Sequence, residues 1–237
     1  MVKRCRICGA QPTVRAHLFP RALSSDIRAG AKHVVAIMPG APRPKFHQSG
    51  EWSDEILCRE HEDVAHDWEE YAIEFSRRYR AFAPPPGANL SVSVANPDPV
   101  ALTMFAHIVV WRHAAAYSHI ARGLGPYFLR IQDAIFSGKP PLEVVLIDPG
   151  HTKDGARARL AICPSPGRLA GRRIFRFDIG GLGFILRTTN KPFEWPFDEG
   201  FSASLNPLVV IQKDPLDIGQ NKSIRKSVQQ GRLTPER

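Results

Sequence analysis

Two pairs of potential metal ligands, each with two residues between its members, constrain this chain more than any other feature. Cys5 and Cys8 form the first pair, and Cys58 and His61 form the second. Zinc takes thiolate and imidazole ligands in a tetrahedron, and this spacing suits a tight knuckle or the first turn of a helix. A knuckle followed by a helix describes a treble-clef finger. The sequence therefore predicts a structural zinc ion, because four protein ligands leave no position open for water.

Length and composition are those of an ordinary folded domain. The chain has 237 residues, of which 43% are hydrophobic, enough for one large domain or two small ones. Its longest apolar stretch, near residues 105–117, is broken by His107, Arg112 and His113, so we expect neither a membrane span nor secretion. Three of the four cysteines lie in the ligand pattern, which favours a cytoplasmic protein without disulfides.

Charge is distributed unevenly along the sequence. The net charge is +9, and residues 1–50 contain many Lys and Arg side chains but a single acid, Asp26. Residues 51–74 are instead rich in Asp and Glu. This order suits a site that holds phosphates and also binds a divalent cation, and it is equally compatible with two solvated faces of opposite sign.

Hydrophobic periodicity divides the chain into two regions. Apolar residues recur at steps of four and three from His61 to Phe82, which predicts an amphipathic helix. Three prolines and a glycine follow, so we expect a linker over residues 83–98 between a module of residues 1–82 and a domain of residues 99–215. Asp98 is the expected N-cap of a helix to about Arg122, and a second helix should cover residues 127–136.

Residues beyond 140 favour strands separated by turns. The expected strands cover residues 144–147, 159–163, 174–179, 184–188 and 208–211. Gly180 and Gly181 suit a hairpin turn. We therefore expect an α+β fold in which the amino-terminal module precedes two helices and a mostly antiparallel sheet, with a basic, poorly ordered tail over residues 216–237.

The order of several motifs matches one known family. His17 opens a His-x-x-Pro segment between the two ligand pairs, and a leucine precedes the second pair. Here the chain resembles the zinc-stapled HNH (His-Asn-His) endonucleases of the ββα-metal group, over about its first third. The matching residues are Cys5, Cys8, His17, Pro20, Leu57, Cys58 and His61. The resemblance implies hydrolysis of phosphodiester bonds with one divalent cation, Mg²⁺ or Mn²⁺, on nucleic acid, with DNA favoured over RNA.

Roles for individual residues follow from this resemblance. His17 would be the general base that takes a proton from the attacking water, a task suited to imidazole near neutral pH. Glu62 and His66 are one helical turn apart, so both should project from one helix face, and the resemblance makes them ligands of the catalytic cation. Asp54 stands in for the family's middle asparagine. Contacts with nucleic-acid phosphates are expected from Arg4, Arg15 and Arg21.

The chain departs from the family pattern in three places. Ala16 occupies a position where the family often has an acidic metal ligand, His61 replaces a cysteine, and no asparagine precedes Leu57. These changes leave a second interpretation open, a non-catalytic zinc-finger-like module that binds nucleic acid or another protein. A third is that the carboxy-terminal domain carries the function. Either a protein partner or a homodimer is compatible with the sequence.

Overall fold

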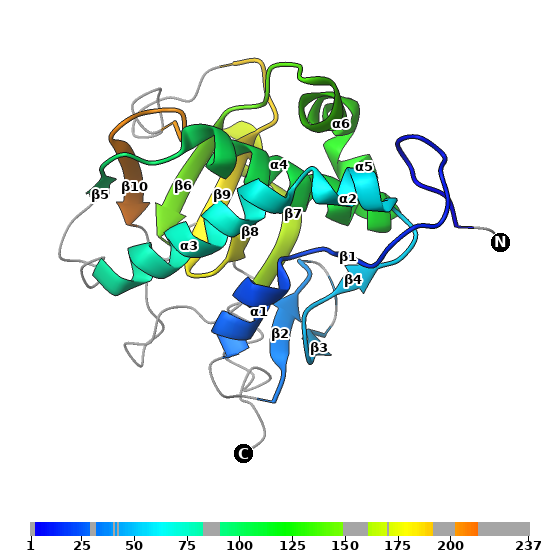
Figure 1. Ribbon diagram of the computed structural model, residues 1–237. Coiled ribbons are helices and arrows are strands. Elements are labelled where there is room, and N and C mark those ends of the chain that lie inside the picture. The colour runs from blue at the N-terminus through cyan, green and yellow to red at the C-terminus, as the bar shows by residue number, and fades with distance from the viewer. Residues whose placement is uncertain are drawn as a thin grey trace.

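One mixed sheet with helices across one of its faces makes up most of the protein (Figure 1). The computed structural model describes residues 3–28, 32–39, 41, 43–82, 91–148, 161–169, 171–191 and 202–212. The helices are α1 (Arg21–Arg28), α2 (Arg59–Asp63), α3 (His66–Phe82), α4 (Pro99–Ala116), α5 (Ser118–Leu124) and α6 (Tyr127–Ser137). The strands are β1 (Ala16–His17), β2 (Val34–Ile37), β3 (Lys45–His47), β4 (Trp52–Ser53), β5 (Ser91–Val94), β6 (Val144–Asp148), β7 (Ala161–Leu169), β8 (Arg172–Ile179), β9 (Leu182–Arg187) and β10 (Leu208–Gln212).

The large sheet confirms the predicted α+β class. Its strand order is β3-β2-β7-β8-β9-β6-β10-β5, and most neighbours are antiparallel. The pairs β2–β7 and β6–β10 are parallel. Gly180 and Gly181 form the turn between β8 and β9, as predicted, and their φ angles of +64° and +82° require residues that tolerate left-handed backbone.

Two of the predicted helices are shorter than expected. The stretch from His61 to Phe82 is divided, because residues 64 and 65 lie in a turn between α2 and α3. The helix that begins after the N-cap Asp98 ends at Ala116, where Tyr117 takes an extended conformation and α5 begins. The Asp98 side chain accepts a hydrogen bond from the Ala101 backbone, which confirms the predicted cap. Three helices, and not two, therefore separate β5 from β6.

Helix α4 is the centre of the core, and its residues 101–115 are all buried. Its Phe105 ring contacts Phe177 of β8 and Phe184 of β9, with centroids 6.2 and 5.2 Å apart. Phe19, from the segment after β1, also packs against Phe177, at 5.9 Å. One hydrophobic core thus includes residues from both of the predicted domains.

No strand was assigned from the sequence to residues 21–50, and the structure forms two strands of the large sheet there. Strands β2 and β3 come from this segment and extend the large sheet beside β7. The predicted linker contributes a strand to the same sheet, because its residues 91–94 form β5 and pair with β10. Residues 83–90 and the predicted tail lie outside the described residues. The division into two domains stays a prediction, although the two regions share a sheet.

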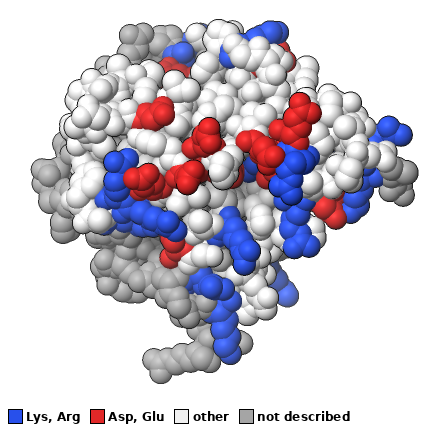
Figure 2. Space-filling view, in the orientation of Figure 1, with Lys and Arg blue, Asp and Glu red and all other residues white. Residues whose placement is uncertain are grey.

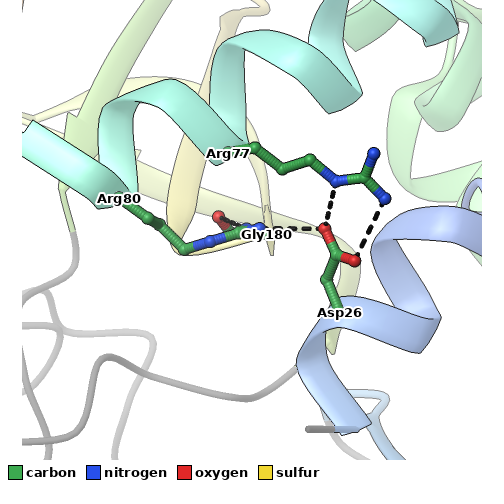
Figure 3. Close-up of polar contacts among 4 residues, drawn as sticks. All are labelled: Asp26, Arg77, Arg80 and Gly180. Atoms are coloured by element: carbon green, nitrogen blue, oxygen red, sulfur yellow. Dashed lines mark hydrogen bonds and ion pairs between the residues drawn. The ribbon is translucent and has the colours of Figure 1, made fainter.

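A partly exposed acid, Asp26, fixes α1 against α3 and the β8–β9 turn (Figure 3). Asp26 accepts two hydrogen bonds from Arg77, at 2.9 and 3.2 Å, and one from Arg80 at 2.9 Å. Arg80 also donates to the carbonyl oxygen of Gly180. The hydrogen bonds from Arg77 and Arg80 lower the pKa of Asp26 below its usual value. This contact holds the amino-terminal helix on the same scaffold as the sheet.

Among the described residues, no helix combines the length and the apolar character that crossing a bilayer requires.

Candidate functional site

The four predicted zinc ligands converge on one point. Nδ1 of His61 lies 3.8, 3.7 and 3.2 Å from the Sγ atoms of Cys5, Cys8 and Cys58, and the Cys8 and Cys58 sulfurs are 3.8 Å apart. Four thiolate and imidazole ligands about 2.0 to 2.3 Å from a tetrahedral zinc ion would be separated by about 3.3 to 3.8 Å. The cluster therefore has the composition and the spacing to hold a structural metal ion.

The local fold explains why these ligands meet. A turn after Cys5 is closed by the Gly9 backbone N–H, which donates to the Cys5 carbonyl at 2.9 Å, and Gly9 has a φ of +74°. Cys58 is the N-cap residue of α2, so His61 follows within the first helical turn. The His61 ring packs edge-on against Phe136 of α6 at 5.4 Å. A metal here would join the amino-terminal knuckle to α2, which packs through His61 against α6.

His17 lies on a short hairpin that continues to this cluster, because Thr13 forms a bridge with Cys58. Strands β1 and β4 pair antiparallel, with Ala16 opposite Ser53 and His17 opposite Trp52. Side chains alternate between the faces of a strand, so Ala16, which is fully buried, faces the core while His17 and Trp52 face outward. An acidic ligand at position 16 would point into the core, which is a physical reason for the alanine.

The His17 side chain has the properties of a proton acceptor. Partial burial lowers its pKa below the usual 6.5, and the positive charges of Arg21, Arg112 and Arg15 lower it further. The imidazole is therefore neutral at pH 7. Among the residues that the structure describes, none donates a hydrogen bond to this ring or accepts one from it.

Arg112 is the residue of this site that sequence reasoning missed. It comes from α4, its side chain is 1% exposed, and its Nη2 lies 3.0 Å from Glu62 Oε1. Its Nη1 donates to the backbone carbonyl of His17 at 3.2 Å and also contacts Glu69 of α3. One guanidinium thus joins β1, α2, α3 and α4. The available signal was that Arg112 is the only Lys, Arg, Asp or Glu in a mostly apolar helix.

Glu62 lies among the charged groups around Arg112. Burial raises its pKa to about 7, against the opposing effect of Arg112, and the neighbouring Glu69 raises it further. Its second carboxylate oxygen, Oε2, is buried and has no hydrogen-bond partner. Glu62 is therefore a desolvated carboxyl committed to Arg112.

Glu62 and His66 do not project from one helix face, contrary to the sequence expectation. The turn at residues 64 and 65 places them on different helices, and the Glu62 side chain is 17% exposed against 74% for His66. His66 points instead toward Glu70, with Nε2 3.9 Å from its carboxylate. Within the described ranges, the Cys5, Cys8, Cys58 and His61 cluster is the only group of three or more side chains suited to a metal. Among the residues that the structure describes, Glu62 and His66 belong to no such group.

The remaining predicted site residues lie on the surface around the hairpin. Asp54 forms an ion pair with Lys3, at 2.6 Å, and this contact lowers the pKa of Asp54. The Arg15 guanidinium lies over the Trp52 ring, with its carbon 4.0 Å from the ring centroid. Arg21 is exposed at the first position of α1, and Arg4 is exposed beside Cys5. Among the described residues, Asp54 and His17 share no hydrogen bond or ion pair, since Asp54 is paired with Lys3.

The charged surface separates acidic from basic regions. Figure 2 shows acidic side chains in a band across the face on which α2 and α3 lie, with Lys and Arg gathered mainly below it. The exposed acids of these two helices are Glu60, Asp63, Asp67, Glu70 and Glu74. A polyanion would be repelled by this band and would meet less repulsion near the hairpin.

Comparisons with family models, with curated proteins and with solved structures found no match to the chain. The fold and the site define an α+β protein with a Cys₃His cluster suited to a structural metal ion.

Proposed function

We propose that the protein is a zinc-stapled, HNH-type metal-dependent hydrolase of phosphodiester bonds in nucleic acid, with DNA as the favoured substrate. The observation that carries the proposal is the position of His17, an imidazole with a lowered pKa on the outward face of a hairpin that continues to Cys58 of the metal cluster. The exposed cations of Arg15 and Arg21 flank it. This combination of a base and phosphate-binding groups suits attack by water on a phosphodiester.

The reaction assigns His17 a single proton transfer. As the water oxygen bonds to phosphorus, its proton passes to the free imidazole nitrogen, and the bond from phosphorus to the leaving oxygen breaks. The leaving oxygen takes its proton from solvent. A lowered pKa keeps the imidazole able to accept the proton at pH 7 and below. Arg112 supports this role by holding the backbone of the same residue.

A catalytic Mg²⁺ or Mn²⁺ is implied by the resemblance, and the described residues do not present a ligand set for it. Glu62 faces Arg112 and His66 faces solvent. Whether a divalent cation takes part is therefore tested by measuring cleavage with and without added Mg²⁺ or Mn²⁺.

The test is cleavage of plasmid and linear DNA by the purified, zinc-loaded protein, with Mg²⁺, Mn²⁺ or neither added. We expect cleavage by the wild type and a loss of about 100- to 10,000-fold in rate for His17→Ala. His119→Ala is the matched control, because His119 is an exposed histidine on α5, and it should cleave like the wild type. Failure of the wild type to cut DNA or RNA with any divalent metal would sink the proposal.

The second candidate is a non-catalytic zinc-finger-like module that binds nucleic acid or a protein. It is favoured by the pairing of Glu62 with Arg112 and by the outward direction of His66. Binding of nucleic acid without cleavage, equal in wild type and His17→Ala, would select this function.

A further inference from the structure

An exposed aromatic ring lies directly beside His17. Trp52 is 41% exposed, although Ile56 and Leu57, a few residues later, are fully buried in the core. It sits opposite His17 in the hairpin register. Directly opposed side chains of an antiparallel pair have their Cβ atoms about 4.5 to 5.5 Å apart. The ring and the imidazole therefore share one small surface.

Arg15 extends this surface. Continuing the register by two residues places Arg15 on the same outward face as His17 and Trp52, and its guanidinium covers the indole ring at 4.0 Å. Among the described residues Arg15 forms no ion pair within 4.0 Å, and Asp54, its neighbour across the hairpin, is paired with Lys3. Both the cation and the ring remain open to solvent.

The contribution of this arrangement to folding stability does not explain why Trp52 is exposed. An exposed cation–π contact is worth only about 0.5 to 1 kcal/mol. Burying an aromatic side chain would stabilise the fold by about 1.5 to 3 kcal/mol more than leaving it exposed. An indole and a guanidinium stacked at the surface are instead the groups on which proteins stack unpaired nucleobases.

We propose that Trp52 and Arg15 form a stacking platform for an unpaired nucleobase, so that the substrate is single-stranded or locally unpaired nucleic acid. This inference deepens the proposed function and rests on it. A base inside a duplex exposes only its edges, because its faces are covered by neighbouring bases, so it must leave the stack to reach a protein ring. The phosphate next to the stacked base would then lie near His17, with Arg21 available as a second cation.

The experiment measures binding separately from cleavage. A His17→Ala background prevents turnover, and fluorescence anisotropy follows a labelled 12-nucleotide DNA strand or the matching blunt duplex without added divalent metal. Trp52→Ala should weaken binding to the single strand by about 5- to 100-fold, the range for loss of one stacked base. Trp52→Phe keeps a flat ring and should recover most of the affinity. Phe82→Ala, which removes another exposed ring at the end of α3, should have no effect.

Several outcomes would overturn the platform. It fails if Trp52→Ala binds the single strand as tightly as the parent protein, or if the duplex binds more tightly than the strand. Competition by a mononucleotide at the same concentration as the strand would assign the surface to free nucleotides. If the parent protein binds neither DNA nor RNA, the proposed function fails as well. If Trp52→Ala in a protein that retains His17 cleaves nucleic acid at the wild-type rate, the platform alone fails. Circular dichroism and zinc content verify folding, and Arg15→Ala provides an independent variant with the same expected direction.

Discussion

The guanidinium of Arg112 donates a hydrogen bond to the backbone carbonyl oxygen of His17 across 3.2 Å, although the two residues are 95 positions apart in the sequence. The same group contacts Glu62 and Glu69. A buried helix from the middle of the chain thereby fixes the strand that carries the candidate base. The amino-terminal site is consequently built on the core and not merely attached to it.

Replacing Arg112 by Gln should destabilise the protein by about 3 to 5 kcal/mol, because a carboxyl group loses its buried counter-charge. Urea denaturation at pH 7 measures the loss. Arg78→Gln is the matched control, since Arg78 and Glu74 form an exposed pair on α3 and its loss should cost about 0.5 kcal/mol or less. Adding Glu69→Gln to the Arg112 variant should restore part of the stability. Equal effects of the two arginine substitutions would contradict a central role for Arg112.

Cys58→Ser should abolish stoichiometric zinc binding and unfold the amino-terminal region, since ligand binding and folding are coupled at structural sites. Metal analysis should give one zinc per chain for the wild type and much less for the variant. Cys163→Ala is the control, because Cys163 is a buried residue of β7 outside the metal cluster. Limited proteolysis then reports folding. Retention of zinc by Cys58→Ser would show that the cluster is not the metal site.

Acid should destabilise the protein through His113. Its Nδ1 donates to the Val109 carbonyl at 2.8 Å, and complete burial lowers its pKa to about 4. In the unfolded chain His113 has a pKa near 6.5, so it is protonated there at a higher pH than in the folded protein. The stability that neutral His113 contributes is therefore present above about pH 6.5 and is lost as the pH falls toward 4. At pH 5 the loss is about 2 kcal/mol.

His113→Gln isolates this contribution, because the other titrating groups are common to both proteins. The free energy of unfolding of the variant relative to the wild type should rise by about 2 kcal/mol between pH 7 and pH 5. Urea denaturation at the two pH values measures this difference. An unchanged difference would mean that His113 accepts a proton in the folded protein as readily as in the unfolded chain.

Asp26→Asn should weaken the attachment of α1 to α3 by about 1.5 to 3 kcal/mol, since the hydrogen bonds lost to Arg77 and Arg80 are charge-assisted. Amide hydrogen exchange should accelerate in α1 before it does in α4. Asp133→Asn, which breaks an exposed pair with Lys139, serves as the control and should cost under about 1 kcal/mol. Uniform acceleration over the whole protein would argue against a local attachment.

Local sequence spacing was sufficient for the two ligand pairs and for the N-cap at Asp98, because each involves residues three positions apart, although the two pairs themselves come from distant parts of the chain. The α+β class was also predictable from periodicity beyond residue 140. The partition of the helix after His61 was not, since the apolar repeat runs through the turn at residues 64 and 65. Only packing against α4 separates the inward Glu62 from the outward His66.

Two further features depend on contacts that no short window contains. Strands β2 and β3 are short, and β2 gains its partner from β7, more than a hundred residues later, so nothing local marked them. From the sequence alone Arg112 is a single charge in a mostly apolar helix, because its partners Glu62 and Glu69 lie on α2 and α3, far away in the sequence. Long-range pairing and buried charge compensation are the parts of this structure that the residue pattern could not supply.

The membership of β2 in the large sheet has a consequence for protein engineering. Excised after Phe82, the amino-terminal segment would lose β7 and leave the backbone N–H and C=O groups of β2 without their partners, an invitation to edge-to-edge association. It would also strip the cover from Phe19. The segment that carries the Cys₃His cluster is therefore not an independent unit, and transferring it to another scaffold would require a replacement for β7.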